Sequence, residues 1–232
     1  MIDLRPFAAL GGADHGWLQA KHHFSFASYH DSERDGWGRL LVWNDDTIAP
    51  GAGFPPHPHR DMEIITYVRK GAITHEDNLG HKGRTKAGDV QVMSAGTGIR
   101  HSEYNLEQEA TQIFQIWIVP ARSGESPRWG ARPFPKGARA GRFVPLASGY
   151  AQDDEALPLR APARVLGATL KAGERVTHVI GRGRLAYLVP AAGTVELGNV
   201  AVAARDGAAI KVEETLEICA VTDAELVLVE VE

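Results

Sequence analysis

The sequence has very little cysteine: Cys219 is the single example among 232 residues. A lone cysteine cannot form a disulfide within the chain, which is typical of proteins from a reducing compartment. No apolar run approaches the roughly 18 residues of a membrane-spanning helix. The first residues also lack the basic start and apolar stretch of a signal peptide. We therefore expect a cytoplasmic protein with no membrane partner.

An excess of positive charge is also missing. Lysine and arginine number 25 against 29 aspartates and glutamates, which gives a formal net charge of -4. Proteins that bind nucleic acids through phosphate contacts need a basic face. The composition therefore argues against direct nucleic-acid binding. With 44% hydrophobic residues, the chain can bury a core in one large domain or two small ones.

Short apolar segments rich in β-branched and aromatic residues occur along the whole chain, separated by glycine and proline. Their length and alternation predict strands. The clearest examples are residues 39–43, 63–68, 112–119, 163–168, 185–189, 194–197, 199–202, 217–221 and 226–230. Evenly spaced short strands without helical periodicity predict an all-β barrel or sandwich.

The composition of the sequence changes between Pro120 and Gly141, where prolines, glycines and arginines are interleaved. This composition predicts a linker or an ordered crossover. Its arginines could form a phosphate-binding patch, but a solvated connector is the favoured interpretation. Since strands resume afterwards, we expect an N-terminal domain at 1–120, a connector at 121–141 and a C-terminal domain at 142–232.

Nine of the ten histidines precede residue 102, so imidazole chemistry is expected in the N-terminal half. Residues two apart in a strand project from the same face, so His57 and His59 can direct two imidazoles to one point. Pro58 would then face away. Because proline cannot donate a hydrogen bond to a neighbouring strand, this strand is expected at a sheet edge.

His101 and Glu103 form a second pair with the same spacing, after Gly96 and Gly98, which permit a tight turn. Two such pairs facing each other would offer three imidazole nitrogens and one carboxylate. This set suits one divalent transition metal, Fe(II), Mn, Co, Ni, Cu or Zn, with coordination positions left open. The absence of a thiolate argues against a closed structural zinc site.

These residues occur in segments that resemble the two motifs of the cupin superfamily. The first motif is matched by Gly51, His57, His59, Glu63 and Gly71, and the second by Gly88, Ser94, Gly96, His101 and Asn105. Ser94 stands where cupins usually have proline, and the last glycine spacing is one residue longer. Both departures fit the pirin family, which residues 23–26, 54–63 and 94–103 strongly resemble. The resemblance covers nearly the whole chain. After the connector it lies in the general pattern of the sequence more than in specific motifs.

The resemblance implies a bicupin, with two antiparallel, jelly-roll-like β-barrels and a metal in the N-terminal one. The matching ligands are His57, His59, His101 and Glu103, and the implied metal is Fe(II). Many cupins use the first-motif glutamate as a ligand, which makes Glu63 a rival to Glu103. We favour Glu103 as the ligand and Glu63 as an outer or structural acid, since ligand histidines usually need such an acceptor.

The remaining histidines receive simpler interpretations. His22, His23 and His30 are expected to pack or to form hydrogen bonds. His75, Asp77 and His81 are expected in a solvated turn between the two motifs. His178 has no partner histidine, so the C-terminal barrel is expected to be structural or to cover the first barrel.

The pirin resemblance implies a quercetin 2,3-dioxygenase, which opens the heterocyclic ring of a flavonol with dioxygen and releases carbon monoxide. Glu103 is the candidate catalytic base for the flavonol 3-hydroxyl. The alternative is a non-enzymatic, iron-binding redox sensor that acts on a protein partner, as some pirins are thought to do. The same four ligands serve either role.

Overall fold

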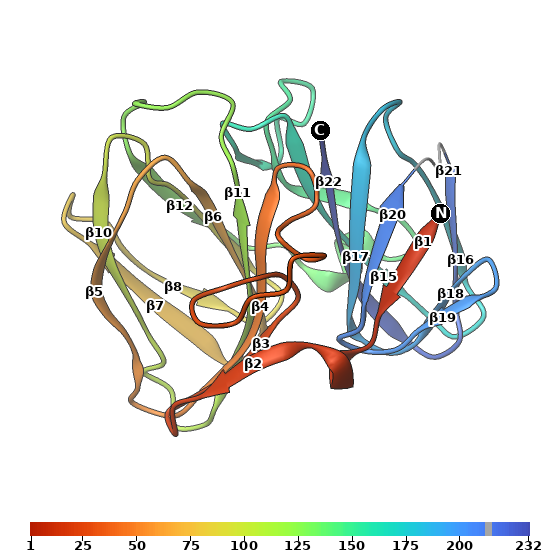
Figure 1. Cartoon of the computed structure of the whole chain (residues 1–232), viewed down its shortest axis with the longest axis horizontal. Helices are drawn as coiled ribbons and strands as arrows, with labels where there is room; N and C mark the ends of the chain where they lie inside the picture. The colour runs from red at the N-terminus through yellow and green to blue at the C-terminus, as the bar shows by residue number, and fades with distance from the viewer. Residues whose placement is uncertain (212–214) are drawn as a thin grey trace.

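The computed structural model describes residues 1–211 and 215–232. Nearly all of its regular structure is strand, arranged in four sheets. Figure 1 shows two domains side by side, and each has one seven-stranded and one four-stranded sheet. The prediction of an all-β chain with two domains is confirmed. Among the helices of the described residues, none is long and apolar enough to cross a membrane.

The N-terminal domain has a large sheet in the order β12-β9-β6-β11-β4-β3-β2 and a small sheet in the order β5-β10-β7-β8. All of its strand pairs are antiparallel. The strands are β2 (Gly11–Asp14), β3 (Leu18–His22), β4 (Leu40–Ile48), β5 (Gly53–His59), β6 (Glu63–Lys70), β7 (Ala72–Asp77), β8 (Lys82–Lys86), β9 (Val90–Ser94), β10 (Ile99–Tyr104), β11 (Thr111–Ile118) and β12 (Arg128–Arg132).

The C-terminal domain repeats this plan, with a large sheet β1-β20-β17-β22-β15-β13-β14 and a small sheet β16-β21-β18-β19. The strands are β1 (Ile2–Arg5), β13 (Val144–Ser148), β14 (Leu157–Pro158), β15 (Ala163–Leu170), β16 (Arg175–Val179), β17 (Leu185–Ala192), β18 (Val195–Leu197), β19 (Val200–Val202), β20 (Gly207–Lys211), β21 (Thr215–Ala220) and β22 (Ala224–Val231). Two short 3₁₀ helices, η1 (Phe7–Ala9) and η2 (Lys136–Arg139), interrupt the connections.

Two strands hold positions that the expected division of the chain did not include. Strand β1 pairs with β20 in the C-terminal sheet, with Ile2 opposite Ile210 and Arg5 opposite Gly207. In Figure 1 this red strand stands among blue ones. Strand β12, inside the expected connector, pairs with β9 and extends the N-terminal large sheet. The chain therefore begins with a strand of the C-terminal sheet, and the N-terminal large sheet continues into the expected connector.

The two large sheets pack against each other, and strand β6 shows how this works. Ile65 and Tyr67 belong to a core cluster that also contains Tyr187 and Val229 of the other domain. Val68 turns the opposite way, into the N-terminal domain's own core. Both faces of β6 are therefore buried, which explains its nearly continuous apolar sequence. Full burial of each such side chain contributes roughly 1.5–3 kcal/mol.

Buried ion pairs also hold the domain boundary. Asp45, whose side chain is fully buried, accepts hydrogen bonds from Arg69 and from Arg205 of the C-terminal domain, the latter with an Nε–Oδ2 distance of 2.6 Å. Breaking such a pair by removing one partner typically costs about 3–5 kcal/mol. These contacts fix the relative position of the two large sheets.

Candidate metal centre

Three histidines from two neighbouring strands of the N-terminal small sheet converge on one point. His57 and His59 lie on β5, and the register places His57 directly opposite His101 on β10. Their candidate ligand atoms all lie within 4.8 Å of one another. The ring centroids are 4.5 Å apart for His57 and His101 and 4.7 Å apart for His57 and His59. Divalent transition metals bind imidazoles in such clusters.

The local sequence explains this geometry. Within the described part of the chain, β5 is an edge strand with β10 as its one partner, as its prolines require. Pro58 is exposed and stands opposite Arg100, while His57 and His59 turn inward. The turn before β10 uses Gly96 at φ 46°, in the left-handed region that favours glycine. The predicted edge position and tight turn are confirmed.

The imidazoles present free nitrogens to the cluster. His57 Nδ1 lies 2.7 Å from the carbonyl oxygen of Pro55. A carbonyl oxygen can only accept, so His57 Nδ1 carries the proton and Nε2 keeps its lone pair. His101 Nε2 is buried and has no hydrogen-bond partner among the residues that the structure describes. An unpartnered buried nitrogen is costly unless something binds it, and a metal ion fits that requirement.

The protonation states also suit metal binding. Burial, with added repulsion from neighbouring imidazoles, lowers the pKa of His101 to about 2. Burial, followed by the effect of His57, lowers the pKa of His59 to about 4. Both rings are therefore neutral near pH 7, as metal ligands must be.

Glu103 lies on the same strand as His101, beyond a register shift that places it opposite Phe54. The group of ligand atoms within 4.8 Å of one another includes the three histidines and not Glu103. Its carboxylate instead accepts hydrogen bonds from Gln91 (2.6 Å), Gln115 (2.7 Å) and Thr66 (3.1 Å). Burial raises the pKa of Glu103 to about 7, although these hydrogen bonds act to lower it. Gln115 on β11 therefore points into the interior of the N-terminal domain.

Glu63, the rival carboxylate, lies elsewhere. It accepts hydrogen bonds from Ser94 Oγ at 2.8 Å and from the backbone N–H of Arg160 at 3.0 Å. Thr66, whose side chain bonds Glu103, lies three positions further along β6, so Glu63 projects from the opposite face of that strand. Glu63 therefore joins the N-terminal domain to the segment before β15.

Sequence reasoning missed the polar residues that surround Glu103. Thr66 and Gln91 face the space between the two sheets, and Thr85 on β8 bonds Gln91 at 3.0 Å. Asp46 is also buried, and burial together with the charges of Asp45 and Glu103 holds its pKa well above the usual range. The one available signal was a polar residue inside an otherwise apolar strand, as at Gln91 in β9.

Aromatic side chains form a wall beside His59. The rings of His59 and Trp117 lie 4.9 Å apart, and Phe26 meets Trp117 edge to face at 5.5 Å. Trp117 Nε1 donates to Gln115 at 3.2 Å, which links the wall to the Glu103 network. His22, behind Phe26, bonds Asn44 at 2.8 Å, as expected of a hydrogen-bonded histidine. Such a wall suits a flat, apolar ligand.

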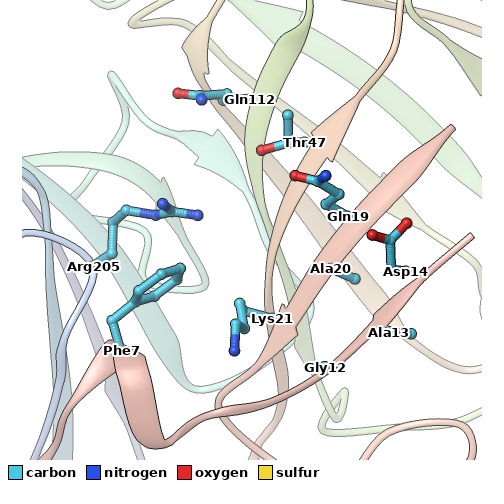
Figure 2. Close-up of a pocket in the computed structure, with 10 residues that line it drawn as sticks. All are labelled: Phe7, Gly12, Ala13, Asp14, Gln19, Ala20, Lys21, Thr47, Gln112 and Arg205. Atoms are coloured by element: carbon cyan, nitrogen blue, oxygen red, sulfur yellow. The ribbon is translucent and has the colours of Figure 1, made fainter. Parts of the chain in front are cut away.

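Two cavities differ in their relation to this centre. One of about 330 Å³ is lined by His59 together with Arg60, Asn78 and Arg100. A larger one, of about 630 Å³, lies between the β2–β3 hairpin and the C-terminal domain. Figure 2 shows Arg205 and Phe7 on one side of it and Gln19 on the other. It contains none of the three histidines, so cavity size does not locate the metal centre here.

The expectation of a solvated turn is wrong for His75 and Asp77. His75 is fully buried, and the side chain of Asp77 is also 0% exposed. The reason is that β7 pairs with β10 on one side and β8 on the other, so it lies inside the small sheet. His81, in the turn that follows, keeps 40% of its side chain exposed.

Comparison with known proteins agrees with this architecture. Residues 4–118 match the family model described as Pirin, and residues 146–231 match the Quercetinase C-terminal cupin domain. A pirin-like protein of Caulobacter vibrioides is 68% identical over 230 residues, which is 99% of both chains. The quercetin 2,3-dioxygenase of Escherichia coli is 40% identical over 229 residues, 98% of this chain and 97% of that one.

A solved structure extends the likeness to three dimensions. YhhW from Escherichia coli has a TM-score of 0.95 at 39% identity and covers 100% of this chain and 98% of its own. A second structure, of bacterial pirin YhhW in complex with nickel(II), has a TM-score of 0.93. The cupin fold and the three-histidine cluster together suggest a divalent metal in this chain as well. The chain belongs to the pirin family of cupin proteins.

Proposed function

We propose that this chain is a metal-dependent dioxygenase that opens the heterocyclic ring of flavonols such as quercetin and releases carbon monoxide. The observation that carries the proposal is the convergence of three imidazoles, with a buried glutamate of pKa about 7 on the same strand as one of them. The quercetin 2,3-dioxygenase name of the Escherichia coli relative supports the choice of substrate.

The proposed ligands are His57, His59, His101 and Glu103, and the proposed ion is Fe(II), with Zn, Mn, Co, Ni and Cu as competitors for the same donors. Glu103 lies outside the group of ligand atoms within 4.8 Å of one another, so its carboxylate would shift toward the imidazoles to join them. Its Oε2 accepts only from Gln115, whereas Oε1 accepts from both Thr66 and Gln91. Since each carboxylate oxygen has two lone pairs, Oε2 retains one for a metal.

The side chains also support the chemistry. A bound divalent ion supplies Lewis-acid stabilisation of a deprotonated flavonol. Glu103 is the proposed base that accepts the 3-hydroxyl proton, for which its carboxylate would leave the metal. Burial raises its pKa to about 7 in the metal-free chain, which matches a proton transfer near neutral pH. Trp117 and Phe26 offer flat surfaces for the substrate rings and exclude water beside His59.

The test begins with protein purified without chelators, whose metal content is measured. Metal-free protein is then reloaded with each candidate ion in turn and mixed with quercetin and a panel of other phenols. We expect oxygen uptake, loss of flavonol absorbance and carbon monoxide in equal amounts. Fully loaded protein that consumes no oxygen with any of these compounds contradicts the proposal and favours the regulatory alternative.

A further inference from the structure

A chain of hydrogen bonds runs from His101 to the protein surface. His101 Nδ1 lies 3.3 Å from His75 Nδ1, and His75 Nε2 lies 3.0 Å from Asp77 Oδ2. The same carboxylate oxygen lies 2.9 Å from His81 Nδ1. His101, His75 and the side chain of Asp77 are buried, so water does not compete for the two inner contacts, whereas His81 is 40% exposed.

The direction of each hydrogen bond in the chain follows from the Asp77 carboxylate, which can only accept. Asp77 also accepts from the backbone N–H groups of Leu79 at 2.9 Å and His81 at 3.1 Å, so donors surround its carboxylate. It therefore accepts from His75 Nε2–H. A neutral imidazole has one N–H, so His75 Nδ1 is left as an acceptor. His101 must then carry its proton on Nδ1.

This order of protons leaves the lone pair of His101 on Nε2. That nitrogen is the buried atom without a hydrogen-bond partner. The relay thus prepares His101 in the tautomer that a metal ion at the three-histidine cluster requires.

Packing holds the middle of the relay in place. The indole of Trp129 stacks on the His75 ring at a centroid distance of 4.8 Å and an interplanar angle of 10°. Gly83 on β8 leaves the space for this indole, because a Cβ there would overlap Trp129. His75 is therefore fixed by both its hydrogen bonds and its ring contacts.

The neighbouring ligand candidate is fixed differently. The Nδ1–H group of His57 donates a hydrogen bond to a backbone carbonyl, so no side-chain substitution removes that acceptor. The acceptor of His101 is a side chain and can be changed. The two histidines therefore offer a contrast within one cluster.

We propose that His75 and Asp77 are positioning residues that set the tautomer of His101 and thereby the metal affinity of the centre. The inference rests on the proposed metal site. Within it, His75 accepts the hydrogen bond from His101, and Asp77 orients His75. His81 only closes the outer end of the chain.

The test compares His75→Phe with His75→Gln. Phenylalanine keeps the stacking on Trp129 but removes both nitrogens, whereas glutamine offers an N–H to Asp77 and an oxygen acceptor to His101. We expect His75→Phe and Asp77→Asn to weaken nickel(II) binding by about 10- to 100-fold, the usual effect of removing an outer-shell partner. His75→Gln should recover most of the affinity, and His81→Gln should bind like the parent protein.

Nickel(II) affinity is measured by competition with a chelator, and nitrogen-15 NMR of the metal-free protein reports which His101 nitrogen carries the proton. His75→Phe and Asp77→Asn should show mixed His101 tautomers. The inference is overturned if both variants keep the parent's affinity and its Nδ1–H tautomer, or if His75→Gln behaves like His75→Phe. Neither readout uses a flavonol or oxygen, so failure of the proposed dioxygenase activity is a separate result.

Discussion

The two domains share one strand plan but fill it with different chemistry. Each has a small sheet in which an edge strand pairs with the strand carrying the inward residues, β5 with β10 and β16 with β21. In the N-terminal domain the space between sheets holds Thr66, Gln91 and Glu103. In the C-terminal domain the core cluster holds Leu188, Leu228 and other aliphatic side chains.

The single histidine of the C-terminal domain shows what this difference means. His178 lies on the edge strand β16, opposite Leu216 rather than another histidine. It contacts the buried Glu230 at 3.0 Å, and Arg184 contacts the same carboxylate at 2.6 Å. Burial acts to raise the pKa of Glu230, but these partners lower it to about 2. One histidine within an ion-pair network is a structural group, whereas three facing imidazoles form a metal-binding arrangement.

The largest effect is expected from removing a proposed ligand histidine of the N-terminal domain, in comparison with removing the histidine of the C-terminal domain. His101→Ala deletes an imidazole at the centre of the cluster, and we expect bound metal to fall to nearly none. His178→Ala should leave the metal content unchanged. Elemental analysis of both purified variants checks this, with circular dichroism to verify the fold. Full metal occupancy in His101→Ala would contradict the proposed site.

The next effect concerns Glu103. Glu103→Gln keeps the shape of the side chain but removes the proposed base, which typically lowers turnover by about 10²–10⁴-fold. The measurement is oxygen uptake with quercetin at equal metal loading. Parent-like turnover in Glu103→Gln would remove this residue from the mechanism.

A third change tests the structural role of the C-terminal domain, whose core is aliphatic. Leu228 is fully buried in the C-terminal core, so Leu228→Ala should lower the free energy of unfolding by about 2–5 kcal/mol. Metal content should not change, because the cavity that this substitution creates lies in the C-terminal domain and the three histidines lie in the N-terminal one. Urea unfolding and elemental analysis together check this. Loss of metal without loss of stability would mean that the two domains are coupled in a way the core packing does not explain.

The smallest effect is a pH dependence at the boundary shared by the domains. His23 is fully buried and contacts Tyr187 Oη at 2.9 Å. Burial, with repulsion from Arg5 and other arginines, lowers the pKa of His23 to about 3. An unfolded chain takes up this proton below about pH 6.5. Stability from the neutral ring is therefore complete above pH 6.5 and is lost as the pH falls toward 3.

Comparison with His23→Gln isolates this group, since all other titrations are common to both proteins. Between pH 7 and pH 5 the metal-free parent should lose about 2 kcal/mol more stability than the variant. Urea unfolding at the two pH values gives the difference. Parallel losses in both proteins would show that His23 does not titrate as its burial predicts.

The sequence predicted what depends on local alternation. His57, His59 and His101 could be found because residues two apart share a face and because prolines mark an edge strand. The cluster of His75 and Asp77 could not be recognised, since its burial depends on β7 having neighbours on both sides. Likewise, nothing near Ile2 indicates that it pairs with Ile210, because long-range pairing leaves no local signal.

The pairing of β1 with β20 makes the N-terminal domain an insertion between the first strand of the C-terminal sheet and the rest of that sheet. During synthesis, residues 2–5 emerge first but have no partner until residues 207–210 follow. The edge pair β1–β20 can therefore form only after most of the chain has been made, and the central strand β22 follows later still. A protease that cuts the chain between 121 and 127 would not separate the halves, because the first fragment would still supply a strand to the second.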